Sequence, residues 1–112
     1  MINYNGRTFA SVQTTENGEV NSNTIFRYYQ EGSVVWADYA GGGIARGHLI
    51  AAVNQQGELD MRYHHVNDKG EIMTGQCYSR PVILPSGKLQ LHEEWQWTCR
   101  DFSRGHSIIE EQ

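Results

Sequence analysis

Cysteine and proline are scarce in this chain of 112 residues, which contains two of each. The cysteines, Cys77 and Cys99, show no Cys-x-x-Cys spacing and so match no common metal-binding or redox motif. Aligning the predicted strands places Cys77 opposite Trp95 and places Cys99 beyond Trp97. That separation is roughly 13 Å along a strand, whereas a disulfide requires Cα atoms within about 7 Å. We therefore expect two free thiols, as is usual in the cytoplasm.

Clusters of basic residues and long apolar runs are also missing. The nine lysines and arginines are spread along the chain, against 13 acidic residues, for a net charge of -4. Nucleic acid and anionic membrane are therefore poor candidate partners. No apolar run approaches the roughly 18 residues of a membrane span. The first residues do not resemble a signal peptide. We expect a cytoplasmic protein with no nucleic-acid or membrane partner.

Helical periodicity is absent, and turn signals take its place. No stretch repeats apolar residues at helical spacing over more than about ten residues. Most of the 12 glycines instead fall in turn-forming clusters such as Asn17-Gly18, Gly41-Gly42-Gly43 and Pro85-Ser86-Gly87. These clusters separate eight predicted strands, at about residues 7–14, 20–30, 33–40, 44–53, 58–66, 71–83, 88–98 and 105–110.

This pattern predicts an all-β fold in one domain over residues 1–112. Strands joined by short glycine turns run antiparallel to their neighbours. Eight of them form an up-and-down meander, which can close into a small barrel. A two-layer sandwich or a curled open sheet is the alternative.

The strand at 88–98 carries the most informative pattern in the chain. Its residues alternate between a polar face and a mostly apolar face. Leu91, Trp95 and Trp97 share the apolar face with one carboxylate, Glu93. A carboxylate on a buried face must be paired, hydrogen-bonded or protonated. We therefore predict that Glu93 lies inside the barrel.

Turn positions also predict which residues face each other across the sheet. They place Trp36 opposite His48, Asp38 opposite Arg46, Leu49 opposite Arg62, and Trp95 opposite Cys77. The resulting inner face is a mixture of small residues and large aromatics: Ala10, Val12, Phe26, Tyr28, Val35, Ala37, Tyr39, Gly47, Leu49, Ala51, Gly75, Cys77, Leu91, Glu93, Trp95, Trp97 and Ile109.

The fifth strand fits this face poorly, because the same alignment turns polar residues inward: Asp60, Arg62 and His64. Either the interior is partly polar, or a β-bulge reverses this strand so that Leu59, Met61 and Tyr63 face inward. The sequence leaves both alternatives open.

The candidate ligand-binding residues are those expected around the interior carboxylate: Glu93, Trp95, Trp97, Tyr28, Tyr39 and Arg62. The alternative is that the aromatic residues only fill the core and that Glu93 only pairs with an arginine. The five histidines bring no three ligands together, so we expect neither a metal site nor a cofactor.

Three segments carry a family resemblance: residues 34–42 (Val-Val-Trp-Ala-Asp-Tyr-Ala-Gly-Gly), the hairpin containing Gly-Glu-Leu-Asp and Met-Thr-Gly-Gln-Cys, and Leu-His-Glu-Glu-Trp-Gln-Trp followed by Ser-Ile-Ile-Glu-Glu. The chain resembles a family of small bacterial proteins of unestablished function, whose short members are sometimes labelled N-acetylglutamate synthase. An acetyltransferase of the usual kind requires a longer α/β chain and a glycine-rich loop that opens a helix, and this sequence offers neither. In architecture the chain resembles the calycin barrels of avidins, lipocalins and fatty-acid-binding proteins.

Three functions are compatible with the sequence. The first is a barrel that binds a small molecule in its interior. The second is a protein-interaction or oligomerisation module with a filled core; if Trp36 and Tyr63 lie outside, they form an apolar patch that a second copy in a homodimer would cover. The third is a small enzyme that uses Glu93 as an acid or base, and we lean against it.

Overall fold

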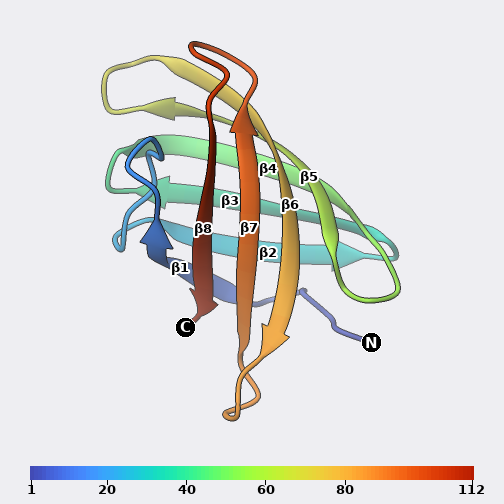
Figure 1. The fold of residues 1–112 in the computed structure, drawn as a ribbon. Helices are drawn as coiled ribbons and strands as arrows, with labels where there is room; N and C mark the ends of the chain where they lie inside the picture. Colours follow the sequence, from blue (N-terminus) through green and yellow to red (C-terminus); the bar gives the residue numbers. More distant parts are fainter.

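Eight antiparallel strands close into one barrel in a computed structural model that describes residues 1–112 (Figure 1). The strands are β1 (Thr8–Thr14), β2 (Ile25–Glu31), β3 (Val34–Gly41), β4 (Ile44–Val53), β5 (Leu59–Asn67), β6 (Ile72–Ile83), β7 (Leu89–Trp97) and β8 (Arg104–Glu111). Each strand pairs with the next along the chain, and β1 pairs with β8 to complete the ring. The structure thus confirms the predicted all-β meander and its closure. No helix in it is long and apolar enough to cross a membrane.

Strand boundaries agree with the prediction to within about a residue except at β2. The prediction started this strand at residue 20, whereas the structure starts it at Ile25. The preceding residues form turns stabilised by side chains. Asn21 Oδ1 accepts a hydrogen bond from the Asn23 backbone N–H, and Thr24 Oγ1 accepts one from the Asn21 N–H. Such local bonds compete with strand pairing, so residues 15–24 form a loop.

A short turn after β4 and a β-bulge within β4 correct the predicted alignment of three strands. Ile44 pairs with Asn67 and Arg46 pairs with Val66, so Ala45 is an extra residue on β4. The β4–β5 turn itself is one residue shorter than predicted, because Asn54 bonds to Glu58 around Gln55, Gln56 and Gly57. From this turn up to the bulge, Leu49 therefore faces Tyr63 rather than Arg62.

The reversal of β5 that the sequence left open is thus real, and it originates in the length of the β4–β5 turn. Leu59 and Met61 are buried inside, whereas Arg62 lies outside in an ion pair with Asp60, 2.8 Å away. The prediction that Arg62 faces the interior is wrong.

The same bulge, with a tight turn at Gly42 and Gly43, also shifts the pairing of β3 with β4. Trp36 faces Ile50 rather than His48. Asp38 faces His48 rather than Arg46, and its carboxylate lies 2.7 Å from His48 Nδ1.

A second irregularity corrects the prediction for β1. Ser11 pairs with Ile109 and Gln13 pairs with Ile108, which leaves Val12 without a partner on β8. Val12 is exposed, and Ser11 is buried. Between β6 and β7 the predicted alignment is confirmed, because Cys77 faces Trp95 and Gly75 faces Trp97. Both cysteines are free, as expected.

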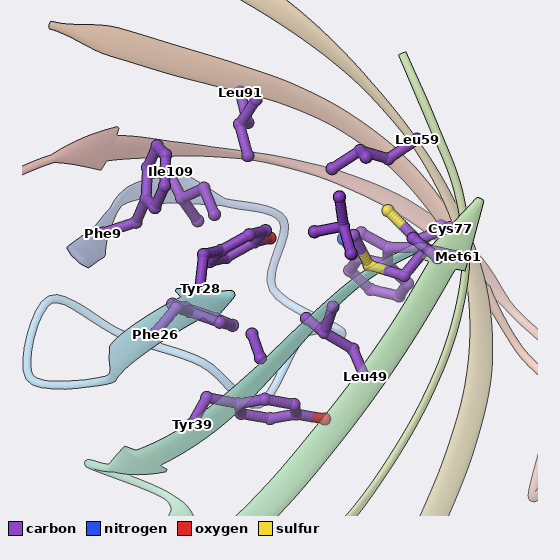
Figure 2. Packing of buried hydrophobic residues seen from close by; sticks show 14 of the residues in the cluster. Phe9, Phe26, Tyr28, Tyr39, Leu49, Leu59, Met61, Cys77, Leu91 and Ile109 are labelled. Carbon is purple, nitrogen blue, oxygen red and sulfur yellow. The ribbon is translucent and has the colours of Figure 1, made fainter. Parts of the chain in front are cut away.

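The core fills one part of the barrel with aliphatic and aromatic side chains from every strand (Figure 2). Phe9 and Tyr28 pack with ring centroids 4.9 Å apart, beside the buried side chains of Leu91 and Ile109. Large inward residues are matched with glycines on the adjacent strand. The cross-strand pairs of this kind are Tyr39 with Gly47, Tyr63 with Gly75, and Trp95 with Gly105. This confirms the expected mixture of small and large interior residues.

Candidate functional site

A cavity of about 60 Å³ lies inside the barrel, between the packed core and the β1–β2 loop. It is bounded mainly by apolar and aromatic side chains with a few polar groups. The lining residues are Gly18, Glu19, Val20, Phe26, Tyr39, Leu49, Met61, Tyr63, His65, Cys77, Glu93, Trp95, Trp97 and Ser107. A site able to hold one water requires about 10–15 Å³ of such space, so the cavity has room for a few waters or a small organic group.

Glu93 is the charged centre of this cavity. Strand alternation turns its side chain inward from the middle of β7, where it is only 9% exposed. Ser79, its cross-strand neighbour on β6, donates a hydrogen bond of 2.7 Å to Glu93 Oε2. Ser107, its neighbour on β8, donates to Oε1 at 3.5 Å. The partners of Glu93 are therefore two hydroxyl groups, and no cation pairs with it.

Burial dominates the ionisation of Glu93. Loss of water around the carboxylate raises the pKa of Glu93 to about 7, and the hydrogen bonds from Ser79 and Ser107 oppose this rise. The carboxyl group is therefore near half ionisation at neutral pH. A group held in this way can either donate or accept a hydrogen bond, or can pair with a charge.

The Ser107 hydroxyl connects Glu93 to the aromatic wall. Trp95 donates a hydrogen bond of 3.2 Å from its indole Nε1 to Ser107 Oγ. Trp95 and Trp97 pack edge to face with centroids 5.4 Å apart, and Tyr63 meets Trp97 in the same manner at 5.9 Å. These contacts fix the orientation of the rings around the cavity.

Tyr28 lies deeper, under the cavity and inside the core. Its side chain is almost fully buried, and its hydroxyl oxygen has no hydrogen-bond partner. Burial raises the pKa of Tyr28 well above its usual value, with a further contribution from the charge of Glu93. Buried hydroxyls almost always have a partner, so this one marks a polar position in the core that no other protein group satisfies.

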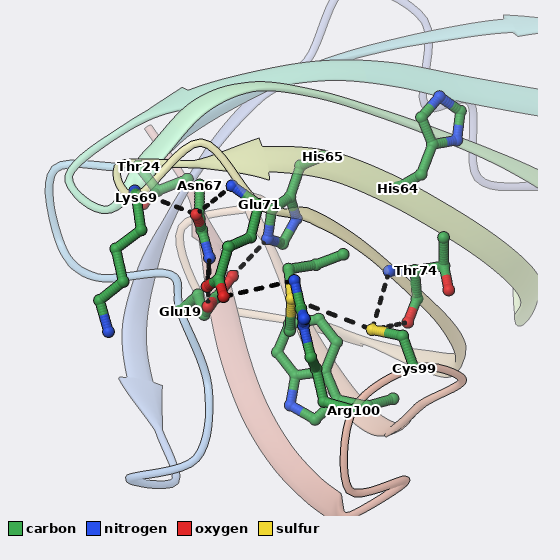
Figure 3. A network of polar contacts seen from close by, with 12 residues as sticks. Glu19, Thr24, His64, His65, Asn67, Lys69, Glu71, Thr74, Cys99 and Arg100 are labelled. Carbon is green, nitrogen blue, oxygen red and sulfur yellow. Dashed lines mark hydrogen bonds and ion pairs between the residues drawn. The ribbon is translucent and has the colours of Figure 1, made fainter.

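The β1–β2 loop closes one side of the cavity, and two of its attachments to the barrel involve residues of the cavity wall. Trp97 donates a 3.0 Å hydrogen bond from its indole Nε1 to the Asn17 carbonyl oxygen. Glu19 accepts two hydrogen bonds from β5, one of 2.7 Å from His65 Nε2 and one of 3.0 Å from Asn67 Nδ2 (Figure 3). This pairing places a second carboxylate, Glu19, in the cavity wall.

His65 is the residue that links the loop to the aromatic wall. Its other ring nitrogen, Nδ1, lies 2.9 Å from the Tyr39 hydroxyl. Burial lowers the pKa of His65, although the hydrogen bond to Glu19 partly opposes that effect. The neutral imidazole is thus favoured at pH 7, and it bridges Tyr39 and Glu19.

The structure brings together four of the six predicted site residues around the cavity: Tyr39, Glu93, Trp95 and Trp97. Tyr28 lies in the core and does not line the cavity, and Arg62 lies on the outer surface.

Sequence reasoning missed four polar residues near the cavity: Glu19, His65, Ser79 and Ser107. The correct β6–β7 alignment already placed Ser79 opposite Glu93, so this residue was within reach of the sequence. His65 needed the correct length of the β4–β5 turn, and Glu19 needed the loop conformation.

The fold and the cavity together define a small closed antiparallel barrel with a partly polar interior site at one end. A sequence-family model described as Avidin-like protein matches residues 2–112, and the chain belongs to this family. This agrees with the expected calycin-type architecture. No curated protein matches the chain.

Proposed function

We propose that this protein binds a small molecule inside the barrel, in the cavity next to Glu93. One observation carries the proposal: a nearly buried carboxylate, bonded only to Ser79 and Ser107, borders about 60 Å³ of space between aromatic rings. Ligand sites are typically apolar cavities with a few convergent polar groups, and the mouths of β-barrels are frequent locations for them. Membership of the Avidin-like family supports an interior site.

A role limited to stability explains Glu93 less well. Removing a carboxylate from water costs several kcal/mol, and an apolar residue of similar size would pack in the same position without that cost. The raised pKa of Glu93 shows that its two hydroxyl partners do not offset the loss of water. The buried charge is therefore better explained by recognition of a ligand than by packing.

A thermal-shift screen of small polar molecules tests the proposal. Three proteins enter the screen: wild type, Glu93→Gln and Glu94→Gln. Glu94 is the matched control, because it is the next residue along β7 and its side chain is 69% exposed on the outer face. A ligand at about 100 times its Kd stabilises the folded state by roughly 2.7 kcal/mol, or about 10 °C for a domain of this size.

Wild type and Glu94→Gln are expected to respond alike to a hit, whereas Glu93→Gln should lose most of the shift. A broad screen without hits, or hits that stabilise all three proteins equally, would refute binding at this site.

Homodimer formation is a second candidate property, supported by the outer surface of β2, β3 and β4. Trp36 is 37% exposed and stacks on Tyr29, with centroids 5.8 Å apart. Its cross-strand neighbour Ile50 and nearby Val34 are also exposed. The predicted partner of Trp36 in this patch, Tyr63, instead faces the cavity. A second copy of the chain covering the patch would remove these apolar groups from water.

A further inference from the structure

The cavity wall contains acidic groups and no basic ones. Glu19 and Glu93 both line it, and no lysine or arginine does. Burial lowers the pKa of His65, so the one histidine in the wall favours its neutral form. The interior therefore presents negative charge that no cation of the protein balances at this site. A positively charged ligand would balance this negative charge.

Glu93 also has hydrogen-bonding capacity left over. An ionised carboxylate can accept about four hydrogen bonds. Ser79 supplies one short bond and Ser107 one long one, and Ser107 at the same time accepts a bond from Trp95. The remaining acceptor positions of Glu93 border the cavity, and a group with several N–H donors would fill them.

The aromatic wall favours the same kind of ligand. Five rings border the cavity: Phe26, Tyr39, Tyr63, Trp95 and Trp97. Aromatic faces attract cations, Trp most strongly, and the attraction grows when the cation leaves water. Folding has already removed water from the Glu93 carboxylate and fixed its position. Binding of a cation therefore does not have to desolvate or orient this group again.

We propose that the ligand of this site is a small organic cation, with a guanidinium, amidinium or ammonium group that pairs with Glu93 between the aromatic rings. This inference rests on the proposed interior binding function and assigns its ligand class. The cavity volume of about 60 Å³ limits the buried part of the ligand to a group of a few heavy atoms. Any larger portion of the ligand must extend past the β1–β2 loop.

A characteristic pH dependence follows. The cation pairs with the ionised carboxylate, so it competes with the proton on Glu93, whose pKa is about 7. The other titratable groups that face Glu93 from neighbouring elements all have raised pKa values and stay neutral at pH 7: Tyr4, Tyr28, Tyr39, Tyr63 and Cys77. Glu19 and His65 lie in the same wall. Affinity for a cation should rise about tenfold from pH 6 to pH 8, because the ionised fraction of Glu93 rises by that factor.

The test compares methylguanidinium with methylurea, which have similar shapes but differ in charge. Binding is followed by nuclear magnetic resonance of 15N-labelled protein. The indole N–H groups of Trp95 and Trp97 report on the cavity, and that of Trp36 reports on the outer surface. At pH 8 methylguanidinium should shift the two inner indole signals and bind at least about tenfold more tightly than methylurea, as expected for a charge-assisted contact in a site of low polarity.

The variants add a second comparison. Glu93→Gln should weaken methylguanidinium binding by about tenfold or more, and Glu94→Gln should leave it within about twofold. If Glu93→Gln does not fold, the comparison of the two compounds and the pH dependence on wild type still decide the question.

Equal or tighter binding of methylurea, unchanged binding in Glu93→Gln, or no binding of methylguanidinium would overturn the cation assignment. These outcomes differ from failure of the proposed function. If neutral compounds shift Trp95 and Trp97, the interior site remains and only its ligand class is wrong. If no compound of either charge shifts these two signals, the interior site itself is refuted.

Discussion

Removal of the charge at Glu93 should change how the stability of the barrel depends on pH. In the folded protein the pKa of Glu93 is about 7, against 4.5 for an unperturbed glutamate. The raised folded-state pKa means that the native protein binds the proton more tightly than the unfolded chain. Stability from this group is therefore fully present below pH 4.5 and is lost as the pH rises through 7. The full loss corresponds to about 3 kcal/mol, and most of it falls between pH 5 and pH 8.

Glu93→Gln keeps the shape and cannot ionise, so it should escape this loss. We expect the variant to gain about 2–3 kcal/mol relative to wild type when the pH is raised from 5 to 8. The measurement is urea denaturation of both proteins at a series of pH values. The difference between the two proteins isolates Glu93, because His65 titrates in both. The lowered pKa of His65 acts in the opposite direction, with stability lost as the pH falls through its range.

Glu94→Gln is the control for this experiment. Glu94 pairs with Arg80 across 3.6 Å on the outer surface, where both side chains are largely exposed. Such a pair contributes at most about 1 kcal/mol, so the difference between this variant and wild type should be nearly constant with pH. If Glu93→Gln also shows a constant difference, then Glu93 is not buried as an ionisable group and the reasoning about the cavity fails.

Three further predictions concern the rest of the barrel. Gly75→Ala should destabilise the protein by about 1–3 kcal/mol, because an added Cβ would lie 2.2 Å from the Tyr63 ring; an unchanged midpoint of urea unfolding would show that the ring moves freely. Thiol titration of unfolded, non-reduced protein should find two thiols per chain, and in the folded state Cys99 should react before the more deeply buried Cys77; no free thiol in a monomer would contradict the alignment. Light scattering at micromolar concentration should give the mass of two chains, and Trp36→Lys should reduce it to one; a monomeric wild type would remove the case for a homodimer.

The fold could be predicted from the sequence because its turns and its alternation are local signals. Asn17-Gly18 and Pro85-Ser86-Gly87 mark chain reversals by residue type alone. The alternation around Glu93 placed this carboxylate on the inner face, and the β6–β7 alignment was correct at Cys77 and Trp95.

Alignment between β4 and β5 could not be predicted, because hairpin loops of three and four residues are both common. Asn54 pairs with Glu58 around a three-residue loop, and this length determines that Arg62 faces water. The bulge at Ala45 adds one residue without a distinctive sequence signal, and it shifts the β3–β4 pairing. The cost of burying Arg62 indicated that either the interior is partly polar or the fifth strand is reversed. That cost alone did not decide between the two alternatives.

The β1–β2 loop contributes Glu19 to the site through tertiary contacts that no local sequence pattern reveals. Glu19 belongs to the site because His65, 46 residues away, holds it with a hydrogen bond of 2.7 Å. His65 in turn faces inward only with the shorter β4–β5 turn. Both residues therefore follow from the alignment of distant strands, which is the least certain product of sequence reasoning.

A crystal structure of the protein with a compound from the thermal-shift screen tests the central claim most directly. The account predicts the compound inside the barrel, within hydrogen-bond distance of the Glu93 carboxylate and in contact with Trp95 and Trp97. A compound bound only on the outer surface, with the space next to Glu93 closed by core side chains, would contradict it.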